Sequence, residues 1–244
     1  MDKETFTYKT EDGLAIEADV YREGTGDTAP VLVYIHGGAL ISGSRSSIKK
    51  EQLESYLAWG YCVISIDYRL APETKLPGIM ADLNDALAWV HAEGPKLFNV
   101  DPGRMGVVGH SAGGYLALMA GCCAPVKPRA VVSFYGYGDI VGDWYAKPDT
   151  FYNHQMPVSK EEAFASVGDH PVSQTSEYQQ RWPFYLYCRQ QGLWPNEVGG
   201  RDPETDPEYF QGYCPEKNVT PAFPPTLLIH GDADTDVPHT QSLQ

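Results

Sequence analysis

A serine occupies the middle of the sequence Gly109-His110-Ser111-Ala112-Gly113. An apolar run, residues 105–108, precedes it, and a run suited to a helix, residues 115–121, follows it. This pattern predicts a tight strand-to-helix turn that presents the Ser111 hydroxyl, because larger residues at the two glycines would clash where the backbone reverses. Its chemistry would be nucleophilic acyl transfer, in which a histidine activates the serine and a carboxylate orients the histidine. A plain glycine-rich turn between two elements is the alternative.

Two further segments accompany this serine. His36-Gly37-Gly38 follows an earlier predicted strand, and an acidic loop, Gly231 to Asp236, follows a later one. Glycines allow backbone N–H groups to approach a substrate closely, and an aspartate after a strand could orient the histidine. The three segments together favour catalysis over a structural turn.

Strands and helices alternate along the chain, as in proteins with a parallel sheet. A hairpin is predicted around Glu11-Asp12-Gly13, and the later apolar runs are typical of strands buried on both faces. We expect the ligand site at the carboxyl ends of the parallel strands. The predicted strands are residues 5–8, 14–21, 31–35, 62–66, 105–108, 131–134 and 227–229, and the predicted helices are residues 50–59, 79–90 and 115–121.

The alternation breaks down between Phe134 and Phe223, where aromatic residues, prolines and glycines are frequent. We interpret residues 134–223 as a cap inserted into a core made of residues 1–133 and 224–244. Ser159-Lys160-Glu161-Glu162 is a capping-box signature for one helix of this cap, and residues 181–191 favour another. Most aromatic side chains are expected to pack the cap onto the core, and a minority to line a substrate pocket.

Composition narrows the choice of partners. The 244 residues carry a formal net charge of −14, which argues against nucleic acid, because phosphate binding needs clustered Lys and Arg. No signal peptide and no apolar stretch long enough to span a bilayer is recognisable, so we expect a cytoplasmic protein without a membrane span. The five cysteines are an odd number without metal-like spacing, and we expect them to be reduced packing residues.

Three segments carry a family resemblance: Tyr34 to Ala39, Asp67 to Glu73, and Gly109 to Gly114. On these segments the chain resembles the hormone-sensitive-lipase-like carboxylesterases, and its acid loop resembles that of feruloyl-esterase-type and prolyl-oligopeptidase-type hydrolases. The resemblance implies an α/β-hydrolase fold, with a mostly parallel sheet, flanking helices and a cap insertion. It also implies hydrolysis of a small-molecule carboxylic ester through an acyl-enzyme, without a metal or an organic cofactor.

The resemblance further implies roles for individual residues. Ser111 would be the nucleophile, and the backbone N–H groups of Gly37, Gly38 and Ala112 would form the oxyanion hole. Asp234 would be the catalytic acid, because it matches the aspartate of the Gly-x-x-Asp-x-x-Val-Pro pattern in relatives. Where many relatives have a third glycine after the histidine this chain has an alanine, which matters little because the donors are main-chain groups.

The acid loop contains three alternating aspartates, Asp232, Asp234 and Asp236, and this alternation is also typical of a calcium loop. Val237, however, stands where a calcium loop needs a glycine, and no glutamate follows at the closing position. No metal site is therefore predicted.

The histidine base is the main departure from the family pattern. In relatives it follows a further strand beyond the acid, whereas this sequence stops at Gln244. We therefore expect the last strand and helix of the fold to be missing, the chain to be a truncated form, and its catalysis to be impaired. An uncovered apolar sheet edge would favour pairing with another chain, which is compatible with a homodimer.

The histidines that are present receive other assignments. His36 belongs to the predicted oxyanion loop, and His230 to the end of a strand. His110 belongs to the strand-to-helix turn around Ser111, which we call the elbow. His239 is close to Asp234 in sequence and could be recruited as a substitute base, although from an unusual loop. The remaining three are assigned to surface or packing positions: His91, His154 and His170.

Two other functions remain open. A protein of this fold that lacks the histidine could bind a small molecule under its cap without catalysis, and the acid loop alone would also fit a serine peptidase. The other charged residues near the motifs receive structural roles. Asp67, Tyr68 and Arg69 are expected to lie at a strand end, with Arg69 paired to Glu73 or Asp82, and Lys49-Lys50 to lie on a solvated surface.

Overall fold

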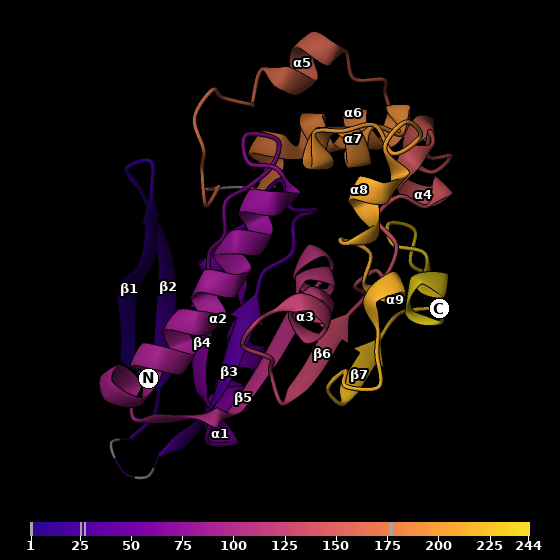
Figure 1. Cartoon of the computed structure of the whole chain (residues 1–244). Helices are drawn as coiled ribbons and strands as arrows, with labels where there is room; N and C mark the ends of the chain where they lie inside the picture. The colour runs from indigo at the N-terminus through magenta and orange to yellow at the C-terminus, as the bar shows by residue number, and fades with distance from the viewer. Residues whose placement is uncertain (1, 25, 27, 176–177) are drawn as a thin grey trace.

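The computed structural model describes residues 2–24, 26, 28–175 and 178–244. Over these residues the strands form one seven-stranded sheet in the order β1-β2-β4-β3-β5-β6-β7 (Figure 1). β1 and β2 pair antiparallel, β2 pairs antiparallel with β4, and the pairs from β4 through β3, β5 and β6 to β7 are parallel. The strands are β1 (Asp2–Glu11), β2 (Leu14–Arg22), β3 (Ala29–Ile35), β4 (Cys62–Ile66), β5 (Val100–His110), β6 (Ala130–Phe134) and β7 (Thr226–Ile229).

The opening hairpin forms where the sequence predicts it. Asp12 and Gly13 make the turn with positive φ angles of 49° and 81°, a conformation that suits aspartate and glycine. β1 is longer than predicted, because its polar residues pair with the whole length of β2. The hairpin therefore adds an antiparallel edge to a parallel sheet.

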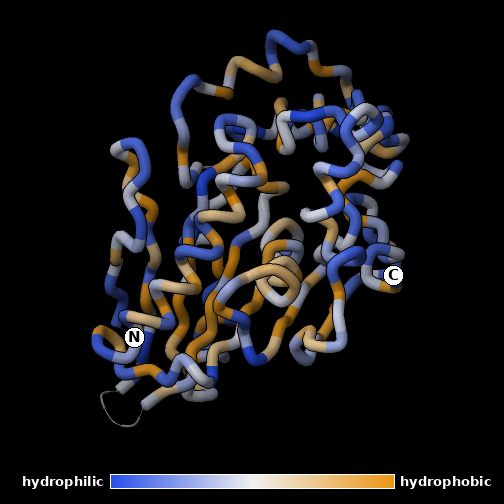
Figure 2. Tube along the Cα trace, in the orientation of Figure 1, coloured by the Kyte–Doolittle hydropathy of each residue, from blue (hydrophilic) through white to orange (hydrophobic). Residues whose placement is uncertain are grey.

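The central strands are buried on both faces, as their continuous apolar sequences predict. Every residue of β4 is buried, and so are the last five residues of β3. Figure 2 shows these strands as a hydrophobic band within a more polar outline. Burial on both faces is possible because helices cover the sheet from two sides.

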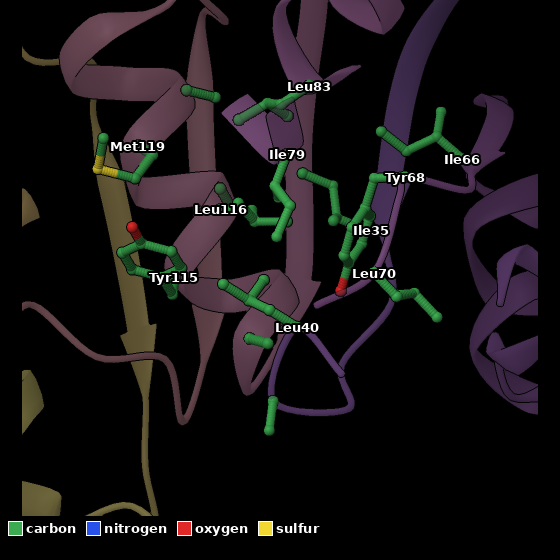
Figure 3. Close-up of a cluster of buried hydrophobic side chains, with 14 of the residues drawn as sticks. Ile35, Leu40, Ile66, Tyr68, Leu70, Ile79, Leu83, Tyr115, Leu116 and Met119 are labelled. Carbon is green, nitrogen blue, oxygen red and sulfur yellow. The ribbon is translucent and has the colours of Figure 1, made fainter. Parts of the chain in front are cut away.

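Three long helices flank the sheet: α1 (Lys50–Ala58), α2 (Leu76–Phe98) and α3 (Ala112–Cys123). α2 and α3 pack on one face, where they enclose the larger part of the core. Figure 3 shows side chains of these two helices, such as Ile79 and Leu116, converging with Ile35 of the sheet. α1 covers the other face through Leu53 and Leu57.

The bounds predicted for the second helix, residues 79–90, are wrong. α2 begins at Leu76 and continues through Gly94 and Pro95, which in the sequence indicate an end. Gly94 faces the Val100 side chain so closely that a β-carbon there would lie 2.9 Å from it. This close contact with β5 stabilises the last turns, and Asn99 then ends the helix in the left-handed conformation.

Most of the long insertion between β6 and β7 forms a layer of short helices at one end of the sheet, and its last helix lies lower, against α3 (Figure 1). Ser159 caps one of them, since its Oγ accepts a hydrogen bond of 3.1 Å from the Glu162 N–H, as its sequence predicts. Trp194 joins the layer to the core by donating from Nε1 to the Ala39 carbonyl at 2.9 Å. The helices are α4 (Asp143–Ala146), α5 (Lys160–Phe164), α6 (Trp182–Gln191), α7 (Trp194–Gly199), α8 (Pro207–Gln211) and α9 (Pro215–Asn218).

β7 forms an exposed edge of the sheet in the described chain. Its apolar residues Leu227, Leu228 and Ile229 are 55, 42 and 41% exposed, and β7 pairs with β6 alone. The short helical turn His239–Ser242 follows the acid loop. No helix in the described residues is both long and apolar enough to cross a bilayer.

Candidate active site

Ser111 lies at the turn between β5 and α3, as the sequence predicts. Its φ and ψ angles are 53° and −119°, an unusual conformation for a residue with a β-carbon. Its N–H donates to the Phe134 carbonyl at 2.9 Å, and its own carbonyl accepts from the Tyr115 N–H at 2.9 Å. The half-buried serine is thus fixed by the backbone on both sides.

Two glycines allow this turn to close. A β-carbon on Gly109 would lie 2.1 Å from the Gly113 carbonyl oxygen, and one on Gly113 would lie 2.1 Å from the Ile35 carbonyl oxygen. Both distances are far below van der Waals contact, and backbone atoms cannot move aside cheaply. The expected steric need for small residues around Ser111 is therefore confirmed.

The predicted oxyanion loop lies directly against the elbow. A β-carbon on Gly37 would lie 3.3 Å from the Ser111 Cβ. Gly38 has a φ of 110°, and its carbonyl accepts hydrogen bonds from Ile41 N at 2.8 Å and Ser42 N at 2.9 Å. This tight turn brings Gly37 and Gly38 beside Ser111 and Ala112.

The backbone N–H groups beside Ser111 make no hydrogen bonds to the described protein. Within the described residues, no acceptor is bonded to the N–H groups of Gly37, Gly38 and Ala112. The Ala112 N–H is the first of α3, so it also lies at the positive end of the helix dipole. Such a group can stabilise negative charge on a ligand oxygen.

His36 supports this loop from below. Its ring is fully buried and stacks on Tyr68 at a centroid distance of 4.3 Å. Nδ1 lies 2.7 Å from the Gly37 carbonyl oxygen. Burial lowers the pKa of His36 to about 4, so the ring is neutral and holds the loop rather than exchanging protons at neutral pH.

Asp234 follows β7 at the same end of the sheet. Its Oδ1 accepts from the N–H groups of Asp236 and Val237 at 2.8 and 2.9 Å, and its Oδ2 lies 3.5 Å from His230 Nε2. Tyr135, which follows β6, has a pKa raised by burial and by the charge of Asp234. Asp234 and Ser111 thus lie on opposite sides of β6, and no hydrogen bond joins them in the described structure.

None of the histidines in the described residues is hydrogen-bonded to Ser111. The His110 ring turns away from the elbow and stacks on Phe134 at 4.6 Å, with Nδ1 3.3 Å from the Tyr34 hydroxyl. His230 is bound to the helical turn after the acid loop, with Nδ1 2.7 Å from Ser242 Oγ. His239 lies beside His230, at a ring-centroid distance of 6.1 Å.

Sequence reasoning missed the role of Asp236. The Tyr152 hydroxyl donates to its Oδ1 at 2.9 Å, the Tyr185 hydroxyl donates to the same oxygen, and Arg189 Nη1 donates to it at 2.6 Å. Arg189 also donates to the Asp236 carbonyl at 3.1 Å. All three donors belong to the insertion, so Asp236 ties the insertion to the acid loop.

Arg189 is buried although it is charged, and its side chain is only 1% exposed. Nη2 donates to Asp149 Oδ2 at 2.6 Å, and the guanidinium lies over the rings of Tyr152 and Tyr145 at 4.6 and 4.9 Å. The sequence contains one signal for this buried arginine. It lies in a helix otherwise rich in Trp, Phe and Tyr, and a guanidinium packs well on aromatic rings.

The predicted ion pair of Arg69 is confirmed for one of its two candidate partners. Nε and Nη2 donate to the two carboxylate oxygens of Asp82, each at 2.7 Å. Glu73 instead accepts from Arg181 of the insertion, at 2.6 and 2.8 Å. Both pairs brace the loops at the carboxyl end of the sheet.

Asp67 is a structural residue, as predicted, and it binds a partner that the sequence did not indicate. Its carboxylate accepts from the Arg45 N–H at 2.6 Å and from the Arg45 guanidinium. Burial raises the pKa of Asp67 to about 6 despite this arginine. Arg45 also donates to Asp19 at 3.0 Å, which connects the loop after Gly38 to β2.

The described residues contain no cluster of three or more His, Cys, Asp or Glu side chains suited to a metal ion. All five cysteines are free.

Comparison with known proteins gives three kinds of match. Residues 18–192 match the BD-FAE family. Among curated proteins, the chain is 37% identical over 172 residues to the non-reducing polyketide synthase trt4 of Aspergillus terreus, and 29% identical over 292 residues to the non-reducing polyketide synthase ausA of Emericella nidulans. These matches cover 64% and 99% of this chain but span only 7% and 12% of those much longer proteins.

Solved structures are similar over almost the whole chain. A Staphylococcus aureus protein of unknown function has a TM-score of 0.79 at 25% identity, covering 100% of this chain and 84% of that one. An α/β-hydrolase superfamily protein from Enterococcus faecalis has a TM-score of 0.76 at 27% identity, covering 99% and 83%. The esterase Est2 of Thermogutta terrifontis shares the fold, with a TM-score of 0.66 at 21% identity, covering 99% and 74%.

Proposed function

Because the chain belongs to the BD-FAE family of esterase-like α/β-hydrolases, we propose that it hydrolyses carboxylic esters with Ser111 as the nucleophile. The observation that carries this proposal is the position of Ser111 at a strained turn beside unbonded backbone N–H groups. A serine there can attack an ester carbonyl while those groups bind the developing oxyanion.

Gly37, Gly38 and Ala112 form the oxyanion hole in this proposal. Two observations support the assignment. Gly37 lies so near the Ser111 Cβ that a β-carbon on it would be 3.3 Å away, and Ala112 stands at the start of α3. Each such donor contributes on the order of 3 kcal/mol to stabilising the tetrahedral intermediate, by analogy with donor deletions in other enzymes. Their arrangement is kept by the buried His36 ring and by the turn at Gly38.

Asp234 is the acid in this proposal. Two backbone N–H groups hold its Oδ1, which leaves Oδ2 to orient an imidazole ring. The His230 ring lies near Oδ2. Its hydrogen bonds to Val237 and Ser242 hold it there, away from Ser111. We therefore propose that this chain hydrolyses esters slowly, because no histidine among the described residues takes the proton of Ser111.

Non-catalytic binding of a small molecule is the second candidate function, and the same observation about the histidines favours it. A serine without a base can still accept and donate hydrogen bonds to a ligand. The two functions differ in whether Ser111 becomes covalently modified.

Fluorophosphonate labelling of Ser111 tests the proposal, with imidazole added as an external base. We expect weak labelling of the chain alone, stronger labelling with imidazole, and a parallel rise in hydrolysis of a short-chain nitrophenyl ester. The Ser111→Ala variant should show none of these. Labelling that survives this substitution, or a chain that stays unlabelled with imidazole, would contradict the esterase proposal and leave ligand binding.

A further inference from the structure

A pocket of about 370 Å³ opens beside the proposed oxyanion hole. Gly37 and Gly38 line the pocket together with Lys49 and with part of a hydroxyl-rich loop, namely Gly43, Ser44, Ser46 and Ser47. His110 and Tyr135 border it on the side of the elbow. Because a β-carbon built on Gly37 would lie only 3.3 Å from the Ser111 Cβ, a group bound in this pocket would lie near the reacting ester.

One lysine and no carboxylate line the pocket, although the protein is strongly acidic. The chain has 32 acidic residues and a net charge of −14, yet none of the described pocket residues is an aspartate or a glutamate. Lys49 supplies the positive charge. His110 stays neutral, because burial and the charge of Lys49 lower its pKa to about 4.

Lys49 differs from the lysine beside it. Lys50 lies 3.7 Å from Glu54 on the next turn of α1, whereas Lys49 has no ion-pair partner in the part of the chain that the structure describes. The nearby Glu51 does not line the pocket, but it lines a neighbouring apolar groove that Lys49 and His110 also line. Both lysines are exposed, as predicted from the sequence, but of the two only Lys49 lines the pocket.

Two hydroxyl groups of the pocket, those of Ser47 and Thr175, accept hydrogen bonds from the backbone. Thr175 Oγ1 accepts from the Gly43 N–H at 2.9 Å, and Ser47 Oγ accepts from the Ser44 N–H at 3.3 Å. A hydroxyl that already accepts from the backbone keeps its own hydrogen for a ligand. A ligand with oxygen acceptors therefore fits this surface, and a negatively charged one fits best.

We propose that this pocket binds a carboxylate group of the substrate, so that the protein selects esters that carry a second, ionised acidic group. Lys49 pairs with the carboxylate, and the hydroxyls of Ser47 and Thr175 donate to its oxygens. This selectivity rests on the proposed ester hydrolysis, whereas binding of a carboxylate in the pocket does not.

Equilibrium binding tests the pocket without requiring catalysis. Benzoate and benzamide have the same shape and differ in charge, and NMR titration gives the dissociation constant of each. We expect benzoate to bind more tightly, and Lys49→Met to weaken benzoate binding by about tenfold, the range for a charged hydrogen bond. Lys49→Arg should retain the affinity. Equal binding of the two probes, or benzoate binding unchanged in Lys49→Met, would overturn the proposal.

Lys50→Met is the matched control, because it removes the same charge from the same helix but does not line the pocket. It should leave benzoate affinity unchanged. If Lys50→Met weakens benzoate binding as much as Lys49→Met does, the attraction comes from overall charge and the proposed site is wrong.

Hydrolysis then tests the selectivity, with imidazole present. The monoethyl ester of terephthalate carries a carboxylate, and ethyl 4-carbamoylbenzoate is its neutral counterpart. We expect a higher kcat/KM for the charged ester, and loss of that preference in Lys49→Met. If neither ester is cleaved while benzoate binding still depends on Lys49, the proposed function fails and the anion pocket stands. Cleavage without a preference overturns the selectivity.

Discussion

Gly113 shows at the level of one residue how little space the elbow leaves. A β-carbon there would lie 2.1 Å from the Ile35 carbonyl oxygen and 2.6 Å from that of His36. Both contacts are with backbone, so the strand itself would have to move.

Gly113→Ala is therefore expected to lower the free energy of unfolding by about 3 kcal/mol or more, the upper part of the range for overpacking. Gly212→Ala is the control, because nothing lies within 4 Å of its β-carbon position and its φ is −67°. Urea unfolding of the two variants measures the difference. Equal stabilities would mean that the elbow can relax more than its geometry indicates.

His110 carries a pH dependence. Its pKa is lowered to about 4 by burial and by Lys49, from an ordinary value near 6.5. Between these values the unfolded chain binds a proton that the native chain does not, so the contribution to stability is complete above about pH 6.5 and is lost as the pH falls toward 4.

We expect the His110→Gln variant to lose stability less steeply than the wild type on acidification. Near pH 5 the two slopes should differ by about 1.4 kcal/mol per pH unit, which corresponds to one proton. Asp67, whose pKa is raised by burial, changes the pH dependence of stability in the opposite direction. This contribution is present in both proteins and cancels when the variant is compared with the wild type. Chemical denaturation at several pH values gives both slopes, and parallel slopes would show that His110 titrates normally.

At the level of elements, α6 and the acid loop behave as one unit through Arg189. Its guanidinium pairs with Asp236 and Asp149 and is almost fully buried. Removing Arg189 leaves Asp149 and Asp236 without their charged partner, and because these carboxylates are 15 and 42% exposed the cost falls below the about 3 to 5 kcal/mol of a fully buried pair. The hydrogen bonds of Asp234 to Asp236 N and Val237 N lie in the same loop.

Arg189→Met should therefore destabilise the fold and also accelerate amide hydrogen exchange at Asp236 and Val237. Arg201→Met is the control, since its ion pair with Asp206 is exposed and should leave stability and exchange unchanged. If Arg189→Met leaves exchange at these two amides as slow as in the wild type, the insertion does not hold the acid loop.

The elements that could be predicted from the sequence are those with a strong local signal. The apolar runs of β3 and β4 and the turn at Asp12-Gly13 give their strands directly. The bounds of α2 could not be predicted, because the close packing of Gly94 against Val100 of β5 is a tertiary contact that the local sequence does not indicate. The glycine positions around Ser111 could also be predicted, from its motif. The pair Arg189–Asp236 could not, because it joins residues 47 positions apart in the sequence.

At the level of the whole molecule, one edge of the sheet is apolar and accessible. The residues of β7 are all exposed, and an unpaired hydrophobic edge is a template for strand addition. The homodimer expected from the sequence stays a prediction, and this edge of the described chain is where a second copy would pair.

Leu228→Lys should therefore reduce the association of the 244-residue chain at high concentration. Leu97→Lys is the control, because Leu97 is equally exposed, at 43% against 42%, but lies on α2. Sedimentation velocity over a concentration series distinguishes the two. A wild-type chain that stays monomeric, or equal association of both variants, would exclude β7 as the interface.

The link between Arg189 and Asp236 also bears on how such a protein could change over generations. The arginine lies in the insertion, and the aspartate lies beyond β7, in the segment that follows it. Exchanging the insertion for a foreign one would remove Tyr152, Tyr185 and Arg189 together and leave Asp236 without its three donors. Recombination that keeps these contacts must therefore transfer residues 149–236 as a block.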